Sequence, residues 1–196
     1  MIEIPKFNPL MHHRQSIRMK GYDYSLAGAY FITIATYQHT CIFGEVLNDK
    51  IKLNKYGCIA FNQWIRLTKR FRDSDFPAFV IMPNHVHGII LIGIGIGTKL
   101  GPHSPKTPSL RSFPKFNVLP GSLGAVVRAY KAAVTYRVNV MRDTARPPIW
   151  QRNYYEHIIR NEEDYETIWN YIETNPQKWI DDRFYQSESA TNSTLK

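Results

Sequence analysis

The pair His85-Val86-His87, at the start of an apolar stretch that runs to Ile92, constrains the fold of this chain more than any other feature. Side chains alternate across a β-strand, so both imidazoles point to one face of the strand while Val86 points to the other. The flanking residues are rich in Val, Ile and Phe, which is typical of a strand. Taken alone, the pair also fits two histidines that only make hydrogen bonds at a strand start, so the prediction of a metal site depends on residues elsewhere.

The charge of the chain points to a polyanionic partner. The 196 residues carry a formal net charge of +9, and the basic residues are interspersed with aromatic ones. Lys and Arg bind phosphates with release of counterions, and aromatic rings stack on unpaired bases. Single-stranded nucleic acid is therefore the expected partner, although a merely basic surface has the same composition.

The cysteines and the apolar segments exclude several classes of protein. Cys41 and Cys58 alone cannot build a disulfide framework or a Cys-rich zinc module, and we expect both to be buried and reduced. Residues 1–11 lack the apolar core of a signal peptide, and residues 89–96 are too short to cross a bilayer. These features predict a cytoplasmic protein with no membrane partner.

Apolar periodicity, turn residues and helix caps predict one α+β domain. Several connections are too short for parallel crossovers, so we expect an antiparallel sheet with helices packed on one face. The expected strands cover 29–37, 76–82, 86–92 and 154–159, with a hairpin over 43–53, and the expected helices cover 55–70, 122–141 and 162–175.

The domain is expected to occupy residues 25–185. Before it, residues 1–24 form a basic arm, and after it, residues 186–196 form a polar tail. Within it, residues 93–120 are rich in Gly, Pro, Ser and Lys and predict a long mobile loop.

The last predicted helix supplies a second set of polar side chains. Tyr171 and Asn175 are four residues apart and therefore lie on the same flank of that helix. The pair could act as a nucleophile and a metal ligand. Equally, Tyr171 could be a boundary core residue and Asn175 a helix terminator before Pro176.

The order of the motifs along the chain resembles that of a known family. Met82-Pro83-Asn84-His85-Val86-His87 is followed by Tyr154-Tyr155-Glu156-His157-Ile158-Ile159-Arg160 and by Tyr171-Ile172-Glu173-Thr174-Asn175-Pro176. This arrangement is similar to the single-tyrosine HUH transposases of the insertion-sequence type, particularly to their REP-associated branch. The resemblance covers most of the chain between Ser16 and Trp179.

The resemblance implies a ferredoxin-like, RRM-like sheet with a catalytic tyrosine on a C-terminal helix. It implies that His85, His87 and Asn175 bind Mg²⁺ or Mn²⁺ and that Tyr171 is the nucleophile. The implied activity is that of a DNA transposase and single-strand endonuclease that cleaves and rejoins single-stranded or hairpin DNA through a 5′-phosphotyrosine. Relatives act as monomers or homodimers, and we assign His157 a structural role.

Basic residues at two places along the chain are expected to hold the DNA. The expected DNA-binding residues are Arg14, Arg18, Lys20, Arg128, Lys131 and Arg137.

Two alternatives to the transposase function remain open: a non-catalytic RRM-like nucleic-acid-binding protein, and an unrelated His-x-His hydrolase or cupin.

Overall fold

The computed structural model describes residues 27–93 and 121–185. The basic arm, the tail and all of the predicted loop except Gly93 lie outside these residues. The described elements are β1 (Gly28–Ala35), η1 (Tyr37–His39), β2 (Gly44–Leu47), β3 (Lys50–Leu53), α1 (Lys55–Ile65), α2 (Leu67–Arg70), β4 (Ser74–Asp75), β5 (Phe79–Ile81), β6 (His85–Ile92), α3 (Leu123–Arg142), β7 (Tyr155–Ile159), α4 (Glu162–Thr174) and η2 (Asn175–Asp181).

The central sheet is antiparallel throughout and has the order β4-β6-β1-β7, with β5 also paired to β6. The main elements follow the ferredoxin-like order of strands and helices, which here is β1-α1-β5-β6-α3-β7. The predicted α+β class and ferredoxin-like architecture are therefore confirmed. β2 and β3 form a separate hairpin.

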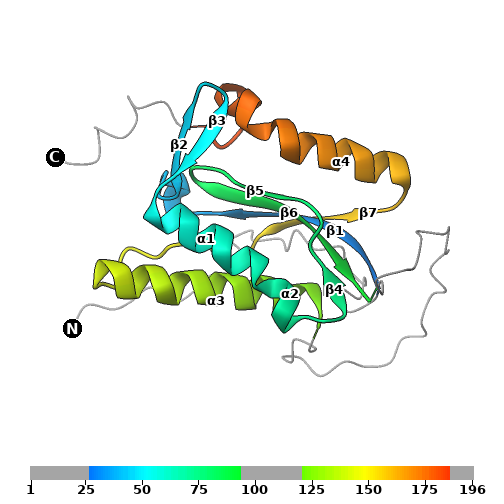
Figure 1. The fold of residues 1–196 in the computed structure, drawn as a ribbon, viewed down its shortest axis with the longest axis horizontal. Coiled ribbons are helices and arrows are strands. Elements are labelled where there is room, and N and C mark those ends of the chain that lie inside the picture. Colours follow the sequence, from blue (N-terminus) through cyan, green and yellow to red (C-terminus); the bar gives the residue numbers. More distant parts are fainter. Residues whose placement is uncertain (1–26, 94–120, 186–196) are drawn as a thin grey trace, which may run out of the picture.

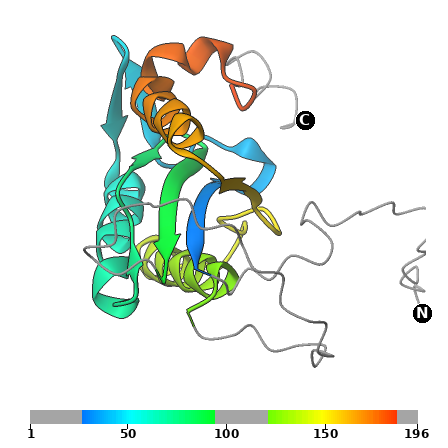
Figure 2. The same ribbon diagram turned by 90° about the vertical axis from the view of Figure 1, so that its right-hand side faces the viewer.

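One face of the sheet is covered by α1 and α3, which lie on the same side in Figures 1 and 2. Alternate residues of β1, such as Tyr30 and Ile32, pack there against Trp64 of α1 and Tyr130 of α3. Gly88 of β6 also points to this face, where a Cβ atom would lie 2.3 Å from the Trp64 ring. Glycine is required at this position because the indole fills the space.

The opposite face is covered by α4 (Figure 1). Ile168 and Ile172 of this helix pack on Phe31 and Ile89, which belong to the intervening residues of β1 and β6. The prediction that the helices pack on one face is therefore correct for α1 and α3 and wrong for α4. Strand alternation gives the sheet two apolar faces, and each needs its own cover.

Three predicted helix starts are confirmed by their caps. Asn54, Ser122 and Asn161 each accept backbone N–H bonds through the side chain at the beginning of α1, α3 and α4. The predicted helix over 55–70 is divided at Arg66 into α1 and α2. Among the described residues, no helix is long and apolar enough to cross a membrane.

The prediction that Cys41 and Cys58 are buried is wrong, because both thiols belong to exposed residues. Cys41 lies between η1 and β2, and Cys58 is on the outer side of α1. The apolar character of cysteine favours burial, but in α1 the buried positions are taken by Ala60 and Trp64.

Candidate active site

His85 and His87 lie side by side on the face of β6 that α4 covers. Their ring centroids are 4.4 Å apart, and both residues are buried. The His87 ring also stacks on Phe31 of the neighbouring strand, at 5.3 Å. The predicted alternation is therefore present, with Val86 packed in the core of the other face.

A neighbouring polar side chain contacts Nδ1 of each histidine. Asn84 Oδ1 lies 2.8 Å from His85 Nδ1, and Thr33 Oγ1 lies 2.9 Å from His87 Nδ1. The Asn84 amide nitrogen donates to the carbonyls of His39 and Phe184, so its oxygen must accept from the His85 ring. These contacts orient both rings and leave the two Nε2 atoms directed at the site, as in metal-binding histidines.

Tyr171 of α4 reaches the histidine pair. Its hydroxyl lies 3.2 Å from His87 Nε2, and its ring meets Phe31 edge-on with centroids 6.0 Å apart. The tyrosine is 38% exposed, so one side of the ring faces solvent. The structure thus brings the predicted nucleophile and a predicted ligand into contact across 84 residues of sequence.

Asn175 is buried one helical turn after Tyr171, where α4 passes into η2. Within the described part of the chain, neither its Oδ1 nor His85 Nε2 has a hydrogen-bond partner, although both atoms are buried. The carboxamide lies close enough to influence the pKa of both His85 and Tyr171. A buried acceptor without a partner is destabilising, and a bound cation at this point would satisfy it.

Asp182, which the sequence analysis missed, completes the cluster. One ligand atom from each of His85, His87 and Asp182 lies within 4.8 Å of the other two. The carboxylate also accepts from Asn175 Nδ2 at 3.1 Å and from the backbone N–H of Phe184 at 2.7 Å. The sequence around Asp182 has no periodic pattern, so only its position seven residues after Asn175, beyond a short 3-10 helix, could have drawn attention to it.

Burial controls the protonation of the site. It lowers the pKa of His85 to about 4, and burial together with the adjacent His85 lowers the pKa of His87 well below its ordinary value. Both imidazoles are therefore neutral at pH 7, as metal ligands must be. Burial and the nearby Asp182 raise the pKa of Tyr171, so its phenol is protonated at neutral pH.

The donor set fits a divalent cation. Ligand atoms of two neutral imidazoles and one carboxylate lie within 4.8 Å of one another, the buried carboxamide of Asn175 contacts that carboxylate, and no cysteine is among these groups. Such a mixed set of N and O ligands suits Mn²⁺ and accommodates Mg²⁺, whereas structural zinc usually adds cysteines.

The predicted DNA-binding residues that the structure describes lie away from this cluster. Arg128, Lys131 and Arg137 are on α3, which covers the opposite face of the sheet. Lys131 Nζ donates to the backbone carbonyls of Gln151 and Asn153, at 2.6 and 3.0 Å. Arg14, Arg18 and Lys20 lie outside the described residues.

His157 lies on β7 and does not join the metal cluster. Its Nε2 is 2.9 Å from Asp164 Oδ2, which ties β7 to the first turn of α4. This contact fits the structural role predicted for it.

No family model matches this chain, but a known protein is similar to it over most of its length. An uncharacterized protein of Haemophilus influenzae is 38% identical over 180 residues, which cover 92% of this chain and 97% of that protein. The chain belongs to the same family as this Haemophilus influenzae protein.

A solved structure shares the fold of this chain. It is a REP-associated tyrosine transposase bound to a REP hairpin, matched with a TM-score of 0.53 and 18% identity over 83% of this chain and 74% of that one. The family member described here therefore has the transposase fold, and the predicted resemblance is confirmed at that level.

Proposed function

We propose that this protein is a transposase and single-strand endonuclease that cleaves and rejoins DNA through a 5′-phosphotyrosine on Tyr171. The observation that carries the proposal is the contact of the Tyr171 hydroxyl with His87 Nε2, at 3.2 Å, beside a buried cluster suited to a cation. A half-exposed tyrosine beside a buried cluster that could hold a cation, in a basic protein, matches the needs of phosphodiester attack.

Mg²⁺ or Mn²⁺ would be held by His85, His87 and an oxygen of Asn175 or Asp182. When bound, the cation supplies Lewis-acid polarisation of the scissile phosphate. Thr33 and Asn84 fix the two rings, so the ligand nitrogens are in place before DNA arrives.

Tyr171 forms the covalent bond in this proposal. Its phenolic oxygen attacks phosphorus, the P–O3′ bond breaks, and the strand leaves with a free 3′-OH. The phenol gives up its proton during attack, and the departing 3′ oxygen takes one up, so the step needs no net proton and no ATP. Reversal by a second 3′-OH rejoins the strand and releases Tyr171.

Arg183 lies where it can assist this attack. Its guanidinium packs over the rings of Tyr155 and Phe184, at 5.4 and 4.6 Å, and its charge lowers the pKa of Tyr171 against the effects of burial and Asp182. A cation in this place favours the phenolate and the negative phosphate alike.

The substrate is proposed to be single-stranded or hairpin DNA. The solved transposase of the same fold was bound to a REP hairpin. The net charge of +9 suits a phosphate backbone, and Arg14, Arg18, Lys20, Arg128, Lys131 and Arg137 are the residues proposed to bind it.

The test is the covalent adduct. Wild-type protein is incubated with Mg²⁺ and single-stranded hairpin DNA from the flanks of its own gene. A denaturation-resistant adduct should form, and peptide mapping should place the 5′-phosphate on Tyr171. Tyr171→Phe should form none, whereas Tyr165→Phe, a matched change at a half-buried tyrosine of the same helix, should react normally.

Two outcomes would count against the proposal. An adduct on another tyrosine, or one that persists in Tyr171→Phe, would remove Tyr171 from the role of nucleophile. DNA binding without any adduct would leave the alternative of a non-catalytic RRM-like binding protein.

A further inference from the structure

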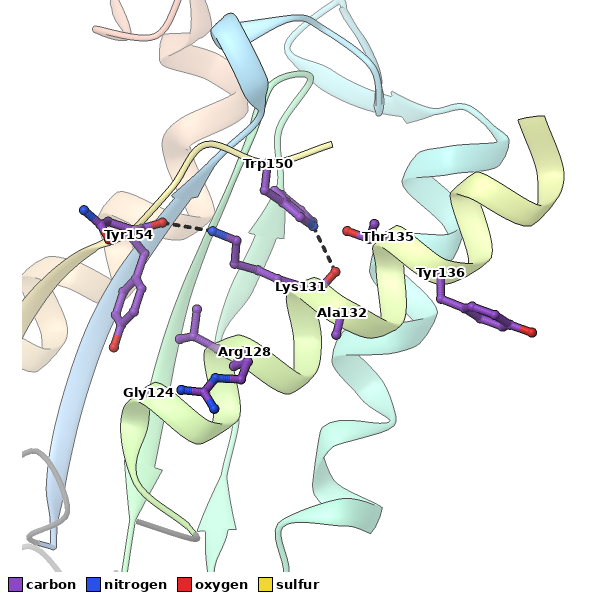
Figure 3. Close-up of a pocket in the computed structure, with 10 residues that line it drawn as sticks. Gly124, Arg128, Lys131, Ala132, Thr135, Tyr136, Trp150 and Tyr154 are labelled. Carbon is purple, nitrogen blue, oxygen red and sulfur yellow. Dashed lines mark hydrogen bonds between the residues drawn. The ribbon is translucent and has the colours of Figure 1, made fainter. Parts of the chain in front are cut away.

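A groove runs along α3 on the face of the sheet that does not carry the histidines. It lies between α3 and residues 150–154 and has a volume of about 680 Å³, which is within the size range of ligand sites. Figure 3 shows residues that line it, from Gly124 along α3 to Tyr136, with Trp150 and Tyr154 beside the helix. We refer to it as the α3 groove.

Among the described residues that line the α3 groove, all of the charged ones are basic. Arg128 and Lys131 both border it, and none of the described residues that line it is acidic. The bonds from Lys131 to the backbone carbonyls of Gln151 and Asn153 hold its ammonium group beside the groove. Arg128 is exposed on the neighbouring turn of the helix. This charge is complementary to phosphate and not to a basic or neutral peptide.

Two tyrosines stand at the ends of the α3 groove. In Figure 3, Tyr154 lies at one end and Tyr136 at the other, with Arg128 and Lys131 between them. Tyr136 is 71% exposed, which is unusual for so large an apolar ring on a helix. Tyr154 is half-buried, and aromatic rings beside cations are the pattern that holds unpaired bases by stacking.

The positive track continues beyond Arg128. A second groove, of about 880 Å³, lies on the other side of this arginine and is bordered by Arg70 and Arg72. Arg128 and Ala132 line both grooves, so the two are joined at α3. One acidic residue, Asp73, borders this second part.

Adjacent tyrosines link the α3 groove to the active-site face. Tyr154 packs against the core under α1 and α3, whereas Tyr155 meets Phe31 on the histidine face, with centroids 6.4 Å apart. They lie at the start of β7, which is an edge strand of the sheet. A strand of nucleic acid can therefore pass round this edge from one face to the other.

We propose that the α3 groove is a second binding site for the single-stranded part of the DNA, with Arg128 on the phosphates and Tyr136 and Tyr154 on the bases. The strand passes round the start of β7, over Tyr155, to Tyr171. This inference rests on the proposed function for its substrate. It adds a site on the far face of the sheet and the residues that form it.

The test uses uncleaved DNA, so that binding is measured alone. In a Tyr171→Phe background, Arg128→Gln should weaken binding of a single strand of about 16 nucleotides several-fold and make the salt dependence of log K shallower by about 0.7, the value for one phosphate contact. Tyr136→Ala should weaken it at least about fivefold, from lost stacking. Arg66→Gln is the matched control, because Arg66 is exposed at the end of α1, lines neither groove and is not among the residues proposed to bind DNA.

Photo-crosslinking locates the strand directly. Iodouracil placed along the same strand should crosslink to peptides containing Tyr136 or Tyr154. If Arg128→Gln and Arg66→Gln behave alike and no crosslink reaches these peptides, the α3 groove is not a DNA site, even where wild-type protein forms the Tyr171 adduct. If the crosslinks and the Arg128 effect appear but no adduct ever forms, the groove stands and the proposed chemistry fails. If no strand binds, both fail.

Discussion

The two faces of the central sheet differ in composition, although the same strands build them. On the α1 and α3 face, twenty of the described residues form one buried apolar cluster, whereas the apolar cluster under α4 contains seven. The α4 face instead buries His85, His87, Thr33 and Asn175. The face under α1 and α3 supplies most of the apolar burial that stabilises the fold. The face under α4 buries the polar residues of the candidate active site in place of apolar ones.

The difference follows from strand alternation. In β1, Tyr30 and Ile32 point to the large core, while Phe31 and Thr33 point to the histidines. The strands that carry the candidate active site are therefore packed on their other face against the large α1 and α3 core. Buried polar atoms without partners, which destabilise a fold, are tolerated on this face because the other face supplies most of the apolar burial.

The largest effect should come from breaking the stabilising face. Trp64→Ala removes the ring that packs against Tyr130, Phe76 and Gly88, and should lower the free energy of unfolding by about 3–5 kcal/mol. Ile65→Ala, next in sequence but 48% exposed, should lower it by less than about 1 kcal/mol. Urea unfolding measures both. Equal losses would show that the large cluster does not dominate stability.

A change on the site face should instead separate chemistry from binding. His87→Ala removes a ligand nitrogen and should reduce Mg²⁺-dependent cleavage about a thousandfold, equivalent to about 4 kcal/mol of transition-state stabilisation. DNA affinity should change little, because phosphate contacts elsewhere supply it. Gel cleavage and anisotropy measure the two. Parallel loss of binding and cleavage would contradict this division.

A smaller effect is expected from the residue that orients the ring. Thr33→Val keeps the shape of the side chain but removes the hydroxyl 2.9 Å from His87 Nδ1, and should weaken Mn²⁺ binding about 10- to 100-fold. Thr68→Val, an exposed change on α2, is the control. Calorimetric titration with Mn²⁺ gives the affinities. Unchanged binding in Thr33→Val would mean that the hydroxyl does not support a metal ligand.

The smallest effect concerns pH on the α3 face. Burial lowers the pKa of Lys131 to about 8, so the ammonium beside the α3 groove is charged below that pH and neutral above it. If the groove binds DNA, affinity should fall roughly threefold between pH 7 and pH 9, beyond the general trend of the protein. Lys131→Arg keeps its charge and should remove this component. A fall of the same size in Lys131→Arg would assign the pH dependence to other groups.

Local sequence signals determined the elements and half of the site. The caps Asn54, Ser122 and Asn161 and the apolar periods predicted every long helix, because these signals act within a few residues. Alternation placed His85 and His87 on one face for the same reason. Helical spacing put Tyr171 and Asn175 on one flank of α4, and the structure brings Tyr171 to His87.

Tertiary structure decided everything that depends on segments distant in the chain. The choice of the second sheet face by α4, the approach of Asp182 to the histidines and the separation of the α3 cations from the site are long-range outcomes. Periodicity shows that a helix has an apolar stripe but not which surface receives it. The large α1 and α3 core occupies the Val86 face, so α4 and the segment after it are left to close over the histidines.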